Sequence, residues 1–120
     1  MSKKSSKWYH SHISDEFVKL ANKENWRSRA VFKLKEIDEK YSLIRPNSNI
    51  LDLGSAPGGW SQYASQKDSS IKITAVDLLP MESIKNVNFV QSDIEDFANN
   101  YLKKDGFVKI DLVMSDIAPN

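Results

Sequence analysis

The segment that most restricts the fold is residues 52–60, which read DLGSAPGGW and follow the apolar residues Ile50 and Leu51. Residues 50–53 predict a buried strand, the glycine-rich stretch after them predicts a loop, and a helix is expected to begin at Trp60. A strand that leads through such a loop into a helix is typical of α/β proteins, in which strands alternate with helices. We therefore expect a mostly parallel sheet with right-handed crossovers.

Apolar periodicity predicts two helices before this segment. Ser14 can cap the first helix, in which Phe17 and Leu20 recur at helical spacing. The second helix is expected over residues 28–41, with an apolar stripe that comprises Ala30, Leu34, Ile37 and Tyr41. Because an α-helix has about 3.6 residues per turn, Lys33 lies about sixty degrees from that stripe and should border the buried face.

Three further strands are expected after the glycine-rich loop, over residues 71–76, 87–90 and 107–114, with a helix over residues 94–104. The connection 78–86 is too short for a full crossover helix, so we expect a turn or a single helical turn there. The chain contains no internal repeat. We expect a basic, flexible arm over residues 1–13 and part of a single domain over residues 14–120.

Charge is unevenly distributed along the chain, although the net charge is only +1. Residues 1–35 carry nine basic and three acidic side chains, whereas the remainder carries eight basic and thirteen acidic ones. Basic residues interleaved with Trp8, Tyr9 and Trp26 suit a polyanionic partner, because lysine and arginine release counterions from phosphates. A solvated basic surface without a partner is the alternative.

The composition excludes several kinds of site. The chain has no cysteine, so disulfides, thiolate metal sites and cysteine nucleophiles are impossible, and no metal site is predicted. No apolar run is long enough for a membrane span, and the lysines near the N-terminus are not followed by the apolar stretch of a signal peptide. A mitochondrial presequence ranks below a plain basic arm, because residues 1–7 contain no arginine. We expect a cytoplasmic protein without membrane association.

The glycine-rich loop is a candidate ligand site. Its glycines let the backbone approach a ligand closely, and the following helix offers free N–H groups. The pattern is D-x-G-x-x-x-G, which differs from the G-x-G-x-x-G that wraps a pyrophosphate. An acidic residue beside the loop, Asp52, suits a cationic ligand group. A tight strand-to-helix turn without a ligand is the alternative.

Four acidic residues stand at or near the carboxyl ends of the predicted strands, namely Asp52, Asp77, Asp93 and Asp116. In open α/β sheets, ligands bind outside these strand ends. A carboxylate at Asp77 can accept hydrogen bonds from two ribose hydroxyls. Asp93 can accept one from an adenine amino group, although a helix N-cap before Ile94 explains it equally well. The rigid Ala118-Pro119 turn suits a fixed orienting or catalytic carboxylate at Asp116.

The chain resembles the FtsJ-like ribosomal RNA 2′-O-methyltransferases of the large-subunit RlmE type. The resemblance extends from about Trp8 to the last residue, and the matching segments are RSRAVFKL at 27–34, DLGSAPGGWSQY at 52–63, DLLPM at 77–81 and MSDIAPN at 114–120. It implies a seven-stranded Rossmann-like methyltransferase sheet, here truncated after the fourth strand. Residues 14–120 would then be the N-terminal part of one methyltransferase domain, and its cofactor would be S-adenosyl-L-methionine.

The resemblance also implies roles for individual residues. The expected cofactor-binding positions are Gly58, Trp60, Asp77, Asp93 and Asp116. The family uses a Lys-Asp-Lys-Glu catalytic set, in which Lys33 matches the first lysine and Asp116 the aspartate. The second lysine and the glutamate belong to later strands, so we expect that this chain is a fragment or a truncated product. Lys33 would mainly position the substrate, and Asp116 would orient the lysines and the cofactor.

The substrate implied by the resemblance is a uridine ribose in large-subunit, 23S-type ribosomal RNA, methylated by a monomeric enzyme on the assembled or nearly assembled particle. The basic region between Lys3 and Lys35 would bind this RNA. One alternative is a catalytically incomplete module that only binds S-adenosyl-L-methionine or RNA. A nicotinamide-binding half-domain is disfavoured because G-x-G-x-x-G is missing. An isolated snorkelling lysine is the structural alternative for Lys33.

Overall fold

The computed structural model describes residues 15–103 and 108–117. The predicted basic arm, with Ser14, lies outside these residues, as do Phe107 and the Ala118-Pro119 turn. The described part opens with helical backbone over residues 15–23, which confirms the first predicted helix. No helix among the described residues is both long enough and apolar enough to cross a bilayer.

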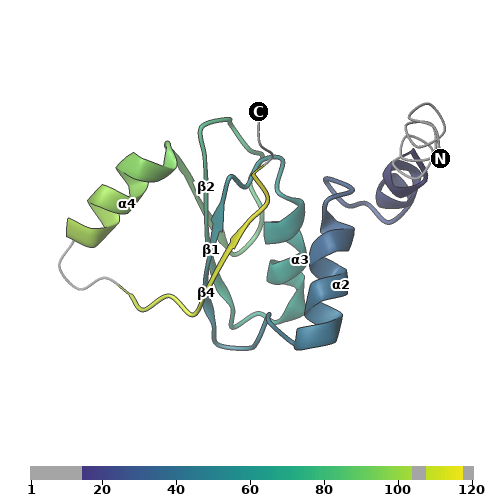
Figure 1. Cartoon of the computed structure of the whole chain (residues 1–120), viewed down its shortest axis with the longest axis horizontal. Coiled ribbons are helices and arrows are strands. Elements are labelled where there is room, and N and C mark those ends of the chain that lie inside the picture. The colour runs from purple at the N-terminus through teal and green to yellow at the C-terminus, as the bar shows by residue number, and fades with distance from the viewer. Residues whose placement is uncertain (1–14, 104–107, 118–120) are drawn as a thin grey trace, which may run out of the picture.

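Four parallel strands form the centre of the fold (Figure 1). They are β1 (Asn49–Leu53), β2 (Lys72–Asp77), β3 (Val87–Gln91) and β4 (Leu112–Ser115). Their order in the sheet is β3-β2-β1-β4, so β1 lies between β2 and β4. The register pairs Leu53 with Val76 on one side and with Ser115 on the other, which aligns the carboxyl ends of the strands. The predicted parallel α/β sheet is confirmed.

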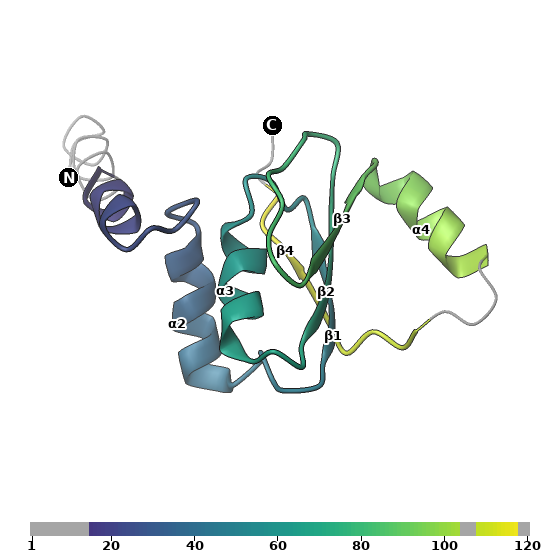
Figure 2. The ribbon, with the colours of Figure 1, turned by 180° about the vertical axis from the view of Figure 1, so that it is seen from behind.

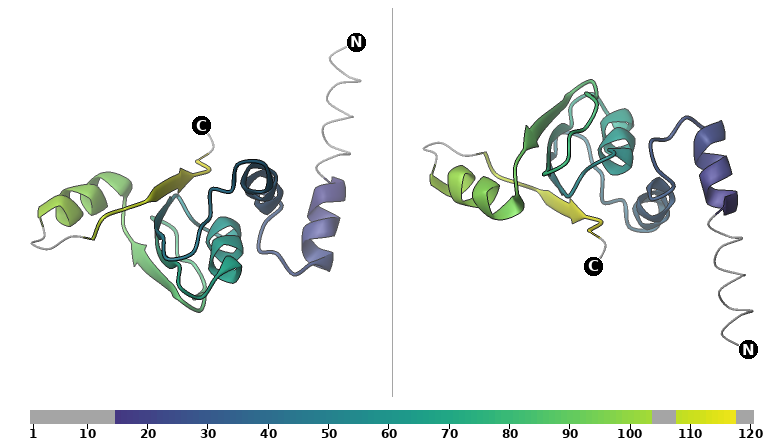
Figure 3. Two further views of the ribbon diagram at one scale, coloured as in Figure 1. Left: turned by 90° about the horizontal axis from the view of Figure 1, so that it is seen from below. Right: turned by 90° about the horizontal axis from the view of Figure 1, so that it is seen from above.

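Three helices flank the sheet, namely α2 (Val31–Tyr41), α3 (Gly59–Lys67) and α4 (Ile94–Lys103). Helices α2 and α3 lie side by side on one face, and α4 lies on the other side and diverges from the sheet (Figures 2 and 3). The hydrophobic core lies between the sheet and the α2–α3 pair, and its residues are Val31, Leu34, Ile44, Ile50, Tyr63, Ala64, Ile71, Ile73 and Met114. The core therefore fixes the position of the glycine-rich loop, which joins β1 to α3.

The buried face of α2 differs from the predicted stripe. Leu34 is buried, but Ile37 is 40% exposed and Tyr41 is 59% exposed. The inward face instead includes Val31 and Asp38. Apolar periodicity missed this face because one of its members is a carboxylate, which is buried with hydrogen-bond partners rather than against apolar atoms.

Two other segments test the predicted boundaries. The connection 78–86 contains no helix, only bends and one turn, as its length predicted. The fourth strand begins at Leu112, and the described residues 108–111 before it are not strand, so the predicted start was wrong. Sheet pairing begins near Asp111, whose N–H donates to the Asn49 carbonyl at 2.8 Å and whose carboxylate accepts from the Asn49 N–H at 2.8 Å.

Candidate functional site

The glycine-rich loop crosses the carboxyl end of β1 and rests on β2. The N–H groups of Gly54 and Ser55 both donate to the Val76 carbonyl, at 2.8 and 3.1 Å. Gly54 has φ of +74°, and an added Cβ would lie 2.6 Å from Cγ1 of Ile117. Gly58, the N-cap residue of α3, has φ of +114°. Glycine is needed at both positions because L side chains rarely adopt such backbone conformations.

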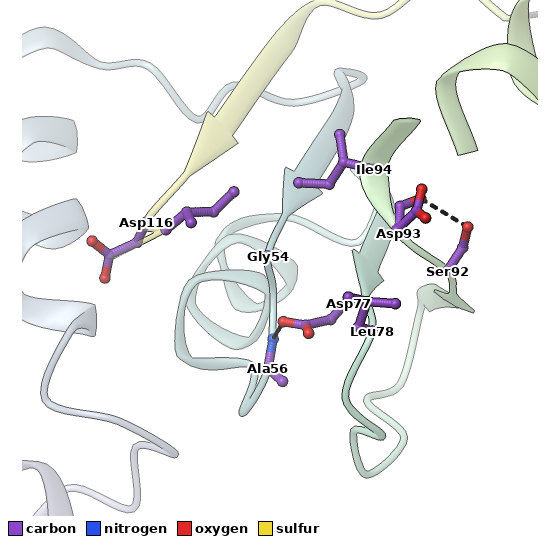
Figure 4. Close-up of a pocket in the computed structure, with 9 residues that line it drawn as sticks. Gly54, Ala56, Asp77, Leu78, Ser92, Asp93, Ile94 and Asp116 are labelled. Atoms are coloured by element: carbon purple, nitrogen blue, oxygen red, sulfur yellow. Dashed lines mark hydrogen bonds between the residues drawn. The ribbon is translucent and has the colours of Figure 1, made fainter. Parts of the chain in front are cut away.

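A pocket of about 350 Å³ opens beside this loop at the carboxyl ends of the strands (Figure 4). Its lining residues are Gly54, Ala56, Asp77, Leu78, Ser92, Asp93, Ile94, Asp116 and Ile117. In Figure 4, Asp116 lies on one side of Gly54, and Asp77 and Asp93 lie on the other. Three of the four predicted acidic residues therefore line one pocket, although they come from segments far apart in the sequence.

Asp77 connects the end of β2 to the loop. One carboxylate oxygen accepts the N–H of Ala56 at 2.8 Å, and the other accepts the N–H of Leu79 at 2.9 Å. Each carboxylate oxygen has two lone pairs, so each can accept a further hydrogen bond from a ligand. Asp77 thus supports the loop and still presents acceptors to the pocket.

Asp93 caps α4, because its Oδ1 accepts the N–H of Asp96 at 2.7 Å. The capping function that the sequence allowed is therefore present, and the same residue also lines the pocket. The cap involves one of the two carboxylate oxygens, which is compatible with a ligand contact through the other.

Lys33 and Asp116 form an ion pair across two elements. The Nζ atom of Lys33, in α2, lies 3.1 Å from Oδ1 of Asp116, just beyond β4. The Lys33 side chain is 67% exposed, so it borders solvent more than the sequence suggested. The pair nevertheless joins the two residues that matched the catalytic pattern, at a position where Asp116 also lines the pocket.

A second, smaller pocket of about 80 Å³ adjoins the first. Its lining residues are Ser28, Ala30, Asp52, Gly54, Ser55, Ala56, Pro57, Gly59, Trp60 and Asp116. The Ser55 hydroxyl is buried and has no hydrogen-bond partner among the residues that the structure describes. Trp60 is fixed by its indole N–H, which donates to the Ala30 carbonyl at 2.7 Å. Its backbone N–H lies in the first turn of α3, where N–H groups lack helical acceptors.

Asp52 is buried beneath the loop, inside β1 rather than at its tip. Burial, which disfavours the charged form, raises the pKa of this carboxyl to about 6, and the nearby carboxylates of Asp77 and Asp116 act in the same direction. A hydrogen bond of 2.7 Å from the Ser61 hydroxyl opposes this rise in pKa. Near neutral pH, the folded chain therefore holds an acidic group whose charge is poorly solvated and which favours a cationic neighbour.

The predicted residues do not all occupy the same surroundings. Gly58 lines neither of the two pockets, and instead faces Arg27, Met81 and Ile84. Ser55 and the apolar wall residues Leu78, Ile94 and Ile117 were not predicted as site residues. Adjacency to the acidic strand ends was the only available signal for the apolar residues. Nothing in the sequence shows that the Ser55 hydroxyl is buried without a partner.

Known proteins resemble this chain in sequence and in fold. A family model described as FtsJ-like methyltransferase matches residues 26–120. The Ribosomal RNA large subunit methyltransferase E of Cupriavidus taiwanensis is 47% identical over 94% of this chain, and that of Legionella pneumophila is 46% identical over 98% of it. A crystal structure of a ribosomal RNA methyltransferase from Plasmodium falciparum is 33% identical, with a TM-score of 0.65 over 79% of this chain and 58% of that one.

The match is partial when measured on the relatives. The chain spans 58% of the Cupriavidus protein and 59% of the Legionella protein. The family model nevertheless matches more than three quarters of the residues of this chain. The glycine-rich loop, the acidic strand ends and the Lys33–Asp116 pair all lie within the matched region. The chain belongs to the FtsJ-like methyltransferase family.

Proposed function

We propose that this chain forms the cofactor-binding part of an S-adenosyl-L-methionine-dependent enzyme that methylates the 2′-hydroxyl of a uridine ribose in large-subunit ribosomal RNA. The observation that carries the proposal is the meeting of Asp77, Asp93 and Asp116 around one pocket beside the glycine-rich loop. The family and the names of its relatives support the reaction class and the RNA substrate.

The two adjoining pockets fit the two halves of this cofactor. The larger has apolar walls at Leu78, Ile94 and Ile117 for an adenine ring, and the carboxylate of Asp77 for ribose hydroxyls. The smaller is suited to the methionine part, because it offers the unpartnered Ser55 hydroxyl and the first turn of α3 to the carboxylate of the cofactor. A buried hydroxyl without a partner destabilises a fold, so a ligand that supplies one fits the site.

Gly54, Ala56 and Asp116 line both pockets and therefore mark their junction. When bound, the cofactor would supply a methyl group on a positively charged sulfur. Asp116 fixes the Lys33 ammonium beside this junction, where it can donate hydrogen bonds to a substrate hydroxyl. Since transfer to a hydroxyl depends chiefly on positioning, Lys33 serves to align the ribose, and Asp116 serves to hold Lys33.

Basic residues extend the site toward a nucleic acid. In the described part of the basic region, Lys19 and Lys23 lie in the helical residues 15–23, and Lys35 lies with Lys33 in α2. Phosphate contacts from such residues fix the orientation of an RNA without reading its sequence. The choice of uridine is supported by the family resemblance, and the choice of the large subunit is supported also by the names of the relatives. A cytoplasmic, monomeric state is part of the same proposal.

Titration calorimetry with S-adenosyl-L-methionine tests the cofactor site. Asp77→Ala should weaken binding by about tenfold or more, because it removes ribose acceptors and the contact with Ala56. Asp111→Ala is a matched control, since Asp111 also accepts a backbone N–H but lies at the amino ends of the strands, away from the pocket. Equal affinity for the wild type and Asp77→Ala would remove Asp77 from the site.

Methyl transfer tests the rest of the proposal. Large ribosomal subunits lacking 2′-O-methyl groups are incubated with the protein and cofactor carrying a radioactive methyl group, and the labelled nucleoside is identified after digestion. Label on the ribose of uridine supports the enzyme. Cofactor binding without transfer would favour the alternative, a module that only binds S-adenosyl-L-methionine or RNA.

A further inference from the structure

Arg27 joins two segments that the cofactor pocket needs together. Its guanidinium donates from Nη1 to the carbonyls of Pro57 and Glu82, at 3.2 and 2.6 Å, and from Nη2 to the carbonyl of Ser83, at 2.9 Å. Pro57 belongs to the glycine-rich loop, whereas Glu82 and Ser83 belong to the β2–β3 connection. One side chain therefore holds two loops that are separated by more than twenty residues.

The backbone of Arg27 is itself held in place. Its N–H donates to the Gln62 side-chain oxygen at 2.9 Å, and the Gln62 amide donates to the Asn25 carbonyl at 3.0 Å. Gln62 lies in α3, which packs beside α2. The guanidinium thus extends from an anchored base, so the hydrogen bonds that it makes can restrain the loops rather than follow them.

The aliphatic stem of Arg27 packs against Gly58, the N-cap residue of α3, whose φ is +114°. A Cβ added at Gly58 would lie 3.2 Å from Cδ of Arg27 and 3.1 Å from both Sδ of Met81 and Cδ1 of Ile84. The loop, the connection and Arg27 therefore meet at the Gly58 α-carbon. Because these contacts are tight, a shift of either loop would disturb the other.

Asp77 ties the same two segments at their inner end. Asp77, the last residue of β2, accepts the N–H groups of Ala56 in the loop and Leu79 in the connection. Arg27 binds the next loop residue, Pro57, and the distal part of the connection. We propose that Arg27 is a positioning residue that locks the glycine-rich loop to residues 78–86 and so holds the pocket open in its binding shape. This inference rests on the proposed cofactor site, but the lock exists without a ligand.

The chemistry of the contact requires arginine. A guanidinium offers five donors in a plane and can satisfy several carbonyls at once, whereas an ammonium is a compact charge on a flexible stem. Arg27→Lys therefore preserves the charge and removes the lock. Arg45→Lys is the matched control, because Arg45 also donates to a carbonyl, that of Ser42 at 2.9 Å, in the turn after α2 and away from the loop.

Hydrogen exchange tests the lock without cofactor. In Arg27→Lys, the hydrogen-bonded amides of both segments should exchange at least about tenfold faster, together, while β1 and α2 are unchanged. These amides are Gly54, Ser55 and Ala56 in the loop and Leu79 in the connection. Arg45→Lys should leave both segments as in the wild type. Faster exchange in only one segment, or in neither, would overturn the proposal.

Cofactor affinity provides the functional test. If loss of the lock leaves about a tenth of the molecules with the loops in the binding conformation, S-adenosyl-L-methionine should bind Arg27→Lys about tenfold more weakly. At saturating cofactor, both segments should regain the slow exchange of the wild type. Unchanged affinity alongside coupled faster exchange would overturn the role in binding. A wild type that does not bind the cofactor would instead refute the proposed function, and the exchange result would still decide the lock.

A measurement on the unmodified chain covers the case in which Arg27→Lys does not fold. In nitrogen-edited spectra, the Nη protons of Arg27 should exchange slowly with water and show hindered rotation, because both nitrogens are held by carbonyls. Nη protons of Arg27 that exchange as fast as the Nη protons of Arg45, which bonds the Ser42 carbonyl through Nε, would contradict the lock.

Discussion

Lys33 and Asp116 are separated by 83 positions in sequence and meet at 3.1 Å. The exposed ammonium contributes little to stability, because surface ion pairs contribute about 1 kcal/mol or less. Its value lies instead in its location beside the junction of the two pockets. A residue that stabilises little and stands at a candidate site is best tested through catalysis.

Lys33→Ala should lower methyl transfer to ribosomal RNA by about a hundredfold, because loss of alignment has effects of that size. Affinity for S-adenosyl-L-methionine should stay within about twofold, since Lys33 lines neither pocket. Transfer is measured with labelled cofactor and binding by calorimetry, both on the same preparations of the variant and its parent. Lys40→Ala, at the far end of α2, is the control. Equal turnover by the Lys33 variant and its parent would exclude the proposed role.

Individual residues differ in how well the sequence predicts them. The acidic strand ends were predictable, because an aspartate after an apolar run stands at the carboxyl edge of a parallel sheet wherever the strands lie. Arg27 was visible only as part of a matching segment. Its acceptors are backbone carbonyls of distant loops, and a carbonyl leaves no mark in a sequence. Asp52 lies within residues 50–53, which the sequence predicted as a buried strand, and it is buried there.

At the scale of elements, Asp38 links α2 to α3. Its buried carboxylate accepts the Ile44 N–H at 2.8 Å and the Tyr63 hydroxyl at 2.9 Å, and it pairs with Lys67 at 3.1 Å. Burial by itself would raise the pKa of Asp38, but the hydrogen bonds from Ile44, Lys67 and Tyr63 outweigh burial and hold this pKa below its usual value. The ionised form is therefore the one that joins the two helices.

Asp38→Ala should lower the free energy of unfolding by about 3 kcal/mol at pH 7, because it removes a buried charged acceptor and leaves the Ile44 N–H and the Tyr63 hydroxyl unsatisfied. Since the folded pKa is below the unfolded one, the contribution of Asp38 is complete above the ordinary aspartate pKa and is lost as pH falls through the folded value. Urea unfolding at a series of pH values should show the variant and the wild type converging in acid. Glu39→Ala, on the exposed face, is the control. A pH-independent difference would contradict the linkage.

Elements that are defined by local sequence signals were predicted well, whereas the buried face of α2, which includes Asp38, was not. Strands β1, β2 and β3 and helix α4 lie close to their expected positions, because apolar runs and a capping aspartate define them locally. The predicted inward face of α2 was wrong at Ile37 and Tyr41, which are exposed. A hydrophobic pattern cannot identify a face that includes a carboxylate, because the partners that make its burial tolerable come from α3 and from the turn after α2.

At the scale of the whole molecule, the sheet is covered unevenly. One face packs on α2 and α3. Among the described elements, only α4 lies beside the opposite face, and it diverges from the sheet. Leu78, Leu79, Val113 and Ile117 are each more than half exposed near the pocket end or on the edge strand. Apolar surface left in water contributes nothing to stability, so the described part of the fold is held mainly by one core.

The isolated chain should therefore melt broadly, and S-adenosyl-L-methionine should raise and sharpen the transition. At about a hundred times its dissociation constant, a ligand that binds only the folded state adds about 2.7 kcal/mol. Thermal denaturation followed by circular dichroism, with and without the cofactor, measures this shift. Adenosine alone, which lacks the methionine part, should give a smaller one. A sharp transition that the cofactor does not move would contradict the argument.

Sequence alternation of strands and helices predicted the parallel sheet but left the order of its strands open. The observed order β3-β2-β1-β4 has β1 in the interior, so successive strands are added first on one side of β1 and then on the other. Ligand crevices arise at this reversal, which is why the glycine-rich loop after β1 has a pocket beside it. The reversal arises because β4 pairs with β1 rather than with β3. This pairing depends on contacts between strands that are distant in the sequence.

The acceptors of Arg27 are uncharged peptide carbonyls, whereas Lys33 faces a carboxylate in solvent. Raising the ionic strength screens interactions between exposed charges beyond about 3 Å at 1 M salt, but it barely affects a hydrogen bond to a neutral group at contact distance. Concentrated salt should therefore release the Lys33 ammonium while the two loops stay joined, so that one solution variable distinguishes the part of the molecule that shapes the pocket from the part that faces the substrate.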